Sequence, residues 1–334
     1  MIVTYLAAFA AALVTTLAAT PLARAVALRF GIVDQPSDRK VHTDPVPYLG
    51  GLAIIVAFIV AVSAGAALTG VSGSYLKIAA ILVGGLLLAA MGLWDDLKVV
   101  PGWIKVPLEL ALGAVLYATG VRARLFHSTP LDLITTMAWV IGVTNAVNYL
   151  DNMDGLTAGV VAIASSYFAV MAGLSGQFLV ASLSAALAGC ALGFLWHNRP
   201  PARIFMGDAG SLFFGFLLAG LGLELRFANI ARITFFVPVA VLAVPVMDAL
   251  MVSLSRVRRG LSPIHPGKDH TSHRLVKVGI PSTAAVGIIY VAALACGWVG
   301  VVIAYSRPLT AYMLMGWMIA MGAFFAMLLL KVEV

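Results

Sequence analysis

Residues 76–93 read LKIAAILVGGLLLAAMGL, and Trp94, Asp95 and Asp96 follow directly. The segment contains one charged residue, Lys77, and approaches the roughly 20 apolar residues with which a helix crosses a bilayer. Polar residues begin only where this apolar run ends. Long apolar runs separated by short polar stretches continue along the whole chain, so we expect a helical protein embedded in a membrane.

Composition supports the same fold class. Of the 334 residues, 62% are hydrophobic and only 10% are charged, whereas soluble domains carry about 25% charged residues. We predict an all-α, polytopic membrane protein with a single transmembrane catalytic domain over residues 1–334, because the longest polar stretches are too short to fold alone. About eleven segments have the length of a membrane span: about 2–22, 49–69, 76–93, 104–120, 131–148, 155–173, 176–196, 210–225, 233–253, 282–304 and 310–330.

Lysine and arginine residues set the expected orientation. With the N-terminus outside and the C-terminus in the cytoplasm, 15 of them lie in inner loops and 6 in outer loops, which accounts for all 21. This asymmetry explains the net charge of +7 better than nucleic-acid binding does. The same topology places five of the six histidines on the inner side, together with most of the acids that lie in polar stretches. We therefore predict an active site on the cytoplasmic face. These acids are Asp95, Asp96, Asp151, Asp154, Asp208 and Asp269.

Asp95 and Asp96 stand at the inner end of the predicted third helix. Because the C-terminus of a helix is the end that disfavours negative charge, the pair requires a cation. That cation is either a metal ion or a lysine such as Lys98 or Lys105. The alternative interpretation is a solvated helix end with Trp94 as an interface anchor.

Polar residues recur at intervals of three and four between positions 148 and 154. In a helix, Asn148, Asp151 and Asn152 would share one face, and their carboxylate and amide oxygens suit a hard cation such as Mg²⁺. Asp154 is also suited to begin the next helix as its N-cap residue.

The stretch Gly207-Asp208-Ala209-Gly210-Ser211 opens the predicted eighth span. One interpretation is that Asp208 or Ser211 only caps that helix. The other is a phosphate site, because the free N–H groups of a helix N-terminus face an anion and an aspartate there can hold Mg²⁺ against a pyrophosphate.

Basic residues dominate the loop from 256 to 277, in which His270 and His273 are three positions apart and Asp269 is within reach of His273. We interpret the loop as a phosphate clamp, because histidine and arginine both donate hydrogen bonds to phosphate oxygens. A solvated, positively charged inner loop is the alternative, and a zinc site is less well supported by the pattern.

Two further carboxylates fall within apolar segments. Asp248 is a candidate functional group, since intramembrane charges are costly, or it pairs with Arg256 and holds the basic loop. Glu109 is expected to pair with Lys105 at a spacing of four residues.

In this order, the motifs resemble those of the polyprenyl-phosphate N-acetylhexosamine-1-phosphate transferases, also described as glycosyltransferase family 4. The resemblance covers nearly the whole chain and rests on five groups: residues 34–51, the Asp95-Asp96 pair, residues 145–155, residues 198–211, and residues 245–248 with the histidine loop. The histidine loop, His270-Thr271-Ser272-His273-Arg274, is closer to the branch that uses UDP-N-acetylglucosamine than to the peptidoglycan translocase.

The resemblance implies a role for each motif. Asp208 would bind Mg²⁺, with Asn148 as a second ligand and Mn²⁺ as a substitute metal. Asp95, Asp96 and Asp151 would be catalytic, the first two by serving the attacking group. The residues that would contact the nucleotide, diphosphate and phosphates are Lys40, Lys105, Asn148, Asp154, Asn198, Phe205, His270, His273 and Arg274.

The implied reaction transfers N-acetylglucosamine-1-phosphate from a UDP-N-acetylhexosamine to undecaprenyl phosphate and releases UMP. It is the first membrane step of cell-envelope glycans such as lipopolysaccharide or teichoic acid, at the bacterial inner membrane. We expect direct attack by the acceptor phosphate, with a covalent aspartyl intermediate as the alternative. Family members often form homodimers. Two alternatives are transfer of phospho-MurNAc-pentapeptide and, in another class, transport of lipid-linked or anionic substrates.

Overall fold

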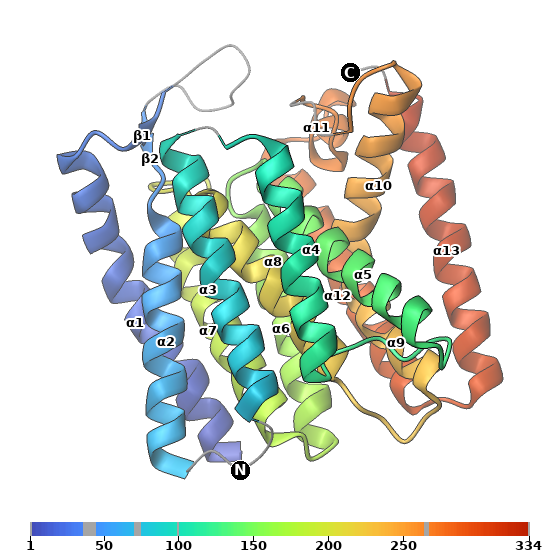
Figure 1. Cartoon of the computed structure of the whole chain (residues 1–334). Coiled ribbons are helices and arrows are strands. Elements are labelled where there is room, and N and C mark those ends of the chain that lie inside the picture. The colour runs from blue at the N-terminus through green and yellow to red at the C-terminus, as the bar shows by residue number, and fades with distance from the viewer. Residues whose placement is uncertain (1, 36–44, 70–74, 99, 264–266, 333–334) are drawn as a thin grey trace.

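The computed structural model describes residues 2–35, 45–69, 75–98, 100–263 and 267–332, and in these ranges the chain folds as an all-α bundle (Figure 1). The N-terminus lies at one end of the bundle, and the C-terminus and α11 lie at the other (Figure 1). The helices are α1 Ile2–Arg29, α2 Gly50–Thr69, α3 Tyr75–Leu97, α4 Gly102–Thr119, α5 Thr129–Leu150, α6 Leu156–Leu174, α7 Phe178–Asn198, α8 Gly207–Glu224, α9 Ala231–Val241, α10 Ala243–Arg258, α11 Thr271–Lys277, α12 Ser282–Tyr305 and α13 Pro308–Leu330.

Seven of the described helices, α1, α3, α5, α6, α7, α12 and α13, are long and apolar enough to cross a membrane, and the number rises to eight if α9 and α10 form one broken span. The chain is therefore a multi-pass membrane protein. Each predicted segment coincides with a helix or with the α9–α10 pair. The count of eleven spans and the orientation remain predictions. The structure also contains a short antiparallel pair of strands, β1 Val33–Asp34 and β2 Val46–Pro47, which the sequence did not predict.

The predicted span 233–253 is not one continuous helix. It divides at Leu242 into α9 and α10, which are bent by 76°. Pro245 explains the position of the break, because proline has no N–H and its ring collides with the carbonyl of the residue four positions earlier, Val241. The bend redirects α10 toward α11 and carries Asp248 with it.

Helix α8 forms the centre of the bundle, and every residue from Ala209 to Leu223 is buried. Helix α3 approaches it closely, since a Cβ atom on Gly92 would lie 2.5 Å from the backbone of Asp208. Helix α7 approaches α1 in a similar way at Gly189 and Gly193. A Cβ atom at either position would lie within 3 Å of backbone oxygens in α1.

Candidate active site at the helix ends

Asp95, Lys105 and Asp208 form one ionic cluster from three helices. Lys105 in α4 makes a short ion pair with Asp95 and lies 3.4 Å, from Nζ to Oδ2, from Asp208. The Asp95 and Asp208 carboxyl groups are within hydrogen-bonding reach of each other, and the Val100 N–H donates to Asp95 at 2.6 Å. The cation that Asp95 required is therefore Lys105. The Asp208 side chain is 33% exposed, so a ligand can reach it.

Asp96 faces away from this cluster and caps α8. Its two carboxylate oxygens accept hydrogen bonds from the backbone N–H groups of Asp208 at 2.8 Å and Ala209 at 3.2 Å. The positive end of the α8 dipole therefore stabilises the Asp96 charge. Gly207 makes the contact possible, because its φ is +68° and a Cβ atom there would lie 2.5 Å from the Asp96 carboxylate.

Asn148 in α5 orients Asp208 from the other side. Its Nδ2 atom donates to Asp208 Oδ1 at 2.9 Å and to Ser211 Oγ at 2.8 Å. The amide nitrogen therefore faces Asp208, and a nitrogen that donates cannot ligate a metal ion. The prediction that Asn148 is a second metal ligand does not fit this arrangement.

The loop before α8 is held by the segment that begins α2. Gly50 and Gly51 donate their N–H groups to the carbonyls of Phe205 and Met206 at 3.0 and 2.9 Å, and the Phe205 N–H donates to the Pro47 carbonyl at 2.8 Å. A Cβ atom at Gly51 would lie 2.4 Å from the Gly210 nitrogen, so only glycine allows this approach. The segment 45–51 thus positions Asp208. The predicted phosphate contact Lys40 lies outside the described residues.

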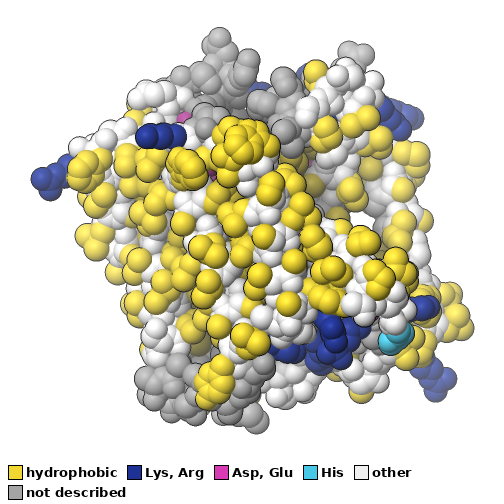
Figure 2. Space-filling model, in the orientation of Figure 1, with side chains coloured by type: hydrophobic (Ala, Val, Ile, Leu, Met, Phe, Trp, Pro, Cys, Tyr) yellow, Lys and Arg dark blue, Asp and Glu magenta, His cyan; other side chains and the backbone are white. Residues whose placement is uncertain are grey.

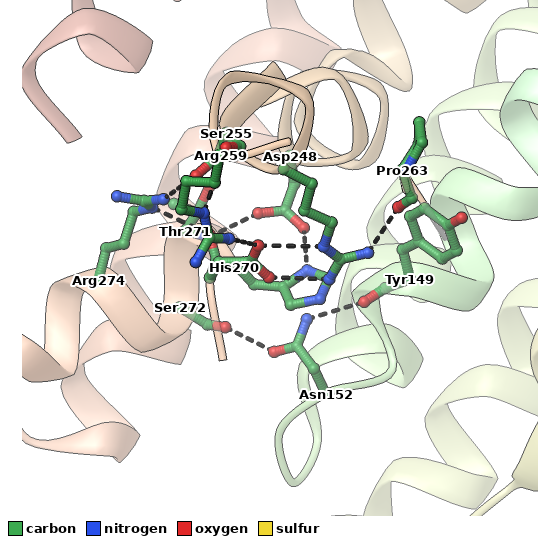
Figure 3. Close-up of polar contacts among 12 residues, drawn as sticks. Tyr149, Asn152, Asp248, Ser255, Arg259, Pro263, His270, Thr271, Ser272 and Arg274 are labelled. Atoms are coloured by element: carbon green, nitrogen blue, oxygen red, sulfur yellow. Dashed lines mark hydrogen bonds and ion pairs between the residues drawn. The ribbon is translucent and has the colours of Figure 1, made fainter. Parts of the chain in front are cut away.

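Asp248 and His270 form the first part of a second polar cluster (Figure 3). Asp248 is 2% exposed, and its Oδ2 lies 2.8 Å from His270 Nδ1 while its Oδ1 accepts the Thr271 N–H at 2.6 Å. Of the two interpretations of Asp248, the structure does not support the pairing with Arg256, which binds Asp269. The bend before α10 turns Asp248 toward α11, and there it fixes the ring of His270.

The sequence placed Asp269 within reach of His273, but Asp269 binds two arginines instead. Arg256 binds both of its carboxylate oxygens at 3.0 and 2.8 Å, and Arg259 adds a contact of 2.6 Å. Burial alone would raise the pKa of Asp269, but the hydrogen bonds and charge of Arg256 hold it below its ordinary value. This buried network fixes the loop that precedes α11.

Arg274 does not fit its predicted phosphate contact. It is 1% exposed, and its guanidinium donates to Ser255, to the backbone carbonyl of Asp269 and to the carbonyls of Leu329 and Val332. All of these acceptors belong to the protein. Arg274 therefore ties α11 to α10 and to the end of α13.

The end of α5 connects the two clusters. Asn148 belongs to the first cluster, whereas the ring of the adjacent Tyr149 meets the ring of His270 edge-on at 6.5 Å. Asn152 donates to the Tyr149 carbonyl at 2.9 Å and accepts from Ser272 at 2.5 Å (Figure 3). Ser272 had not been identified from the sequence. The only sequence feature that pointed to Ser272 was its position between two histidines.

Several predicted pocket residues act as supports. Asn198 is 3% exposed, accepts the Gly155 N–H at 2.9 Å and donates to the Ile204 carbonyl at 3.0 Å. Asp154 accepts the Ala202 N–H at 2.8 Å instead of capping the next helix. Glu109 binds Asn145, at 2.7 Å, and not Lys105 as expected, because Lys105 is held by Asp95. Phe205 is half-buried at the start of the α8 loop.

Burial and the nearby charges of Asp208, Asp96 and Asp154 raise the pKa of Asp151 to about 7. Burial and the neighbouring His270 lower the pKa of His273 to about 4, so His273 is neutral near pH 7. Within the described chain, the buried atoms His273 Nδ1 and Thr271 Oγ1 have no hydrogen-bond partner. Buried polar atoms without a partner are rare in folded proteins.

The raised pKa of Asp151 predicts a pH-dependent stability. The folded protein keeps a proton that the unfolded chain loses near pH 4, so stability should fall as the pH rises from about 4 to about 7, by up to about 4 kcal/mol. In Asp151→Asn this contribution should disappear. Thermal unfolding in detergent with EDTA, compared at about pH 5 and pH 8, measures it. Equal pH slopes in the wild type and the variant would contradict the assignment.

The oxygen chemistry of the first cluster suits Mg²⁺. No three His, Cys, Asp or Glu side chains among the described residues form a metal-binding group. Mg²⁺ does not need one, because it usually keeps several waters and binds one or two carboxylates together with substrate phosphates. Asp208, partly exposed and at the N-terminus of α8, meets this requirement.

The chain is similar to known membrane transferases. The model of glycosyl transferase family 4 matches residues 78–226. A probable undecaprenyl-phosphate N-acetylglucosaminyl 1-phosphate transferase of Bacillus subtilis is 35% identical over 85% of this chain and 80% of the relative. The decaprenyl-phosphate N-acetylglucosaminephosphotransferase of Mycolicibacterium smegmatis is 33% identical, over 87% and 78%. An Escherichia coli K12 undecaprenyl-phosphate alpha-N-acetylglucosaminyl 1-phosphate transferase is 27% identical, over 85% and 80%. This chain belongs to glycosyl transferase family 4.

Proposed function

We propose that the protein transfers N-acetylglucosamine-1-phosphate from UDP-N-acetylglucosamine to undecaprenyl phosphate and releases UMP. The observation that carries the proposal is the convergence of Asp95, Lys105 and Asp208 at the N-terminus of α8. An ammonium group, an accessible carboxylate and a helix N-terminus together suit a diphosphate with its metal ion. The names of the relatives supply the sugar and the type of acceptor.

In the proposed reaction, an oxygen of the acceptor phosphate attacks the phosphorus that carries the sugar. One P–O bond forms there, and the bond to the bridging oxygen breaks, so UMP leaves with that oxygen. The acceptor phosphate has a second pKa near 6 and is mostly dianionic at neutral pH. It therefore needs little activation, and Asp151, with a pKa of about 7, is suited to take the remaining proton.

The other residues position the reactants. Asp95 holds Lys105 where its charge can bind phosphate oxygens, and Asn148 orients Asp208. Asp96 acts on the helix and not on the substrate, because both of its oxygens are occupied by the N–H groups of α8. A bound Mg²⁺, for which Mn²⁺ can substitute, would be held by Asp208 and would neutralise charge on the donor diphosphate.

The second cluster would bind the donor. With Nδ1 directed at Asp248, the Nε2 atom of His270 remains for a phosphate oxygen. The buried atoms Thr271 Oγ1 and His273 Nδ1 are further candidates for contact with the nucleotide. We place the site on the cytoplasmic face of a bacterial inner membrane, in a protein that can form homodimers.

Product release tests the proposal. The purified protein should form UMP and a lipid-linked sugar diphosphate in equal amounts from UDP-N-acetylglucosamine and undecaprenyl phosphate with Mg²⁺, and EDTA should stop the reaction. UDP-N-acetylgalactosamine and UDP-MurNAc-pentapeptide serve as comparison donors. No UMP from any of the three would overturn the transferase function. A phosphorylated aspartate trapped during turnover would instead replace direct attack by a covalent mechanism.

A further inference from the structure

The end of the bundle opposite the candidate site carries a concentration of basic side chains. They appear as a dark blue area low in the view, near the ends of α4 and α9 (Figure 2). Three arginines define this surface, which we call the arginine patch: Arg122 and Arg124 in the α4–α5 connection, and Arg232 in the first turn of α9. We propose that the arginine patch binds the phosphate headgroup of an anionic phospholipid in the adjacent leaflet.

The α4–α5 connection is a rigid support for two of these arginines. Val121 and Ala123 are buried, whereas Arg122 is partly exposed and Arg124 is exposed, so the extended chain directs the basic side chains outward. The Ala123 N–H donates to Thr136 Oγ1 at 3.1 Å, which pins the segment to α5. Arg122 also lies over the ring of Tyr117, with its guanidinium 5.2 Å from the ring centroid.

The third arginine is brought to the same place by a bond between distant parts of the chain. Arg232 Nε donates to the Leu125 carbonyl at 2.9 Å, which leaves its terminal nitrogens for another acceptor. Beside the patch, burial lowers the pKa of Arg226, Glu224 opposes this effect, and the charge of Arg124 lowers the pKa further.

The acids at this end of the bundle are already occupied. Asp132 is 7% exposed and accepts the N–H groups of Leu125 and Phe126 at 3.0 and 2.9 Å. Glu224 pairs with Lys77 and Arg226. No described carboxylate forms an ion pair with the arginine patch, and residues 70–74, which are not described, read GVSGS and contain no acid.

These observations favour a lipid phosphate. The patch follows the end of a bilayer-length bundle, so it lies at headgroup depth, and guanidinium groups bind phosphate oxygens with paired hydrogen bonds. Phe126 is 51% exposed beside the arginines, as expected for an aromatic ring at a membrane interface. A basic cluster at this depth is attracted to anionic headgroups by about 1 kcal/mol per arginine.

Phosphatidylglycerol retention, measured by native mass spectrometry of the whole protein released from nanodiscs, tests the proposal. Wild-type protein should retain phosphatidylglycerol over phosphatidylcholine. Loss of one arginine of the patch should weaken retention about fivefold, and loss of two, in Arg124→Gln with Arg232→Gln, about 30-fold. The matched control is Arg258→Gln with Lys277→Gln, which removes two exposed charges at the other end of the bundle and should not change retention.

Three outcomes would overturn the lipid site. The first is equal retention of phosphatidylglycerol by the wild type and the double variant. The second is displacement of the lipid by millimolar glycerol phosphate, which would indicate a site for free phosphate. The third is that the wild type retains phosphatidylcholine as well as phosphatidylglycerol, while the arginine patch captures an acidic protein. Circular dichroism should give the same helix content for both double variants, so a loss of folding is recognised directly.

Discussion

Asp208→Asn should lower UMP release by about 10³-fold or more while the protein still folds. The substitution keeps the size of the side chain and an oxygen that can accept the Asn148 hydrogen bond, but it removes the charge that faces Lys105. Loss of one electrostatic group at a reacting centre typically costs about 10² to 10³ in rate, and loss of a metal ligand adds to this. Steady-state UMP release over a Mg²⁺ titration measures the effect.

Ser211→Ala is the matched control for Asp208→Asn. It removes the other hydrogen-bond partner of the Asn148 amide without changing any charge. We expect it to lower the rate by less than about tenfold. If Asp208→Asn kept a rate within tenfold of the wild type, Asp208 would not be the metal ligand.

The two adjacent aspartates should respond differently to the same substitution. Asp95→Asn should reduce turnover by at least about 10²-fold, because Lys105 loses the closer of its two charged partners. Asp96→Asn should lose about tenfold, since the asparagine oxygen can accept one of the two N–H groups that begin α8 but its amide nitrogen cannot accept the other. Asp96→Ala removes the acceptor and should again lose about 10²-fold, with a higher Mg²⁺ requirement because Asp208 is no longer held in place.

Gly207→Ala tests the same contact from the other side. Its Cβ atom would collide with the Asp96 carboxylate and would occupy an unfavourable positive φ, so we expect a loss similar to that of Asp96→Ala. The decisive comparison is between the Asn and Ala variants at position 96. If both were inactive and folded, Asp96 would act as a proton acceptor or metal ligand, and the capping role would be wrong.

The helices could be predicted from the sequence because a membrane-spanning helix requires apolar residues only within its own segment. A segment such as 76–93 must be apolar over its whole length to lie in a bilayer, and the sequence alone reveals this. The break at Leu242 was not predicted, although Pro245 was visible, because proline within an apolar segment can also be accommodated by a kink. Its 76° bend depends on how α9 and α10 pack against α12 and α13.

The sequence predicted which residues form the site better than it predicted which partners those residues contact. The need of the Asp95-Asp96 pair for positive charge followed from helix electrostatics, and Lys105 fulfils it for Asp95. The partner of Asp96 could not be inferred, because it is the N-terminus of a helix more than 100 positions away, and only the packing of α3 on α8 brings the two together. The contacts of Arg274 could not be inferred for a similar reason, since three of its acceptors lie in α10 and at the end of α13.

The tether made by Arg274 has a practical consequence for handling the protein. Because its guanidinium binds the carbonyls of Leu329 and Val332, the end of α13 is tied to the second polar cluster. Affinity tags and fluorescent fusions are therefore better attached at the N-terminus, at the opposite end of the bundle (Figure 1). Trimming the chain before position 329 to aid crystallisation would release the segment that carries both histidines.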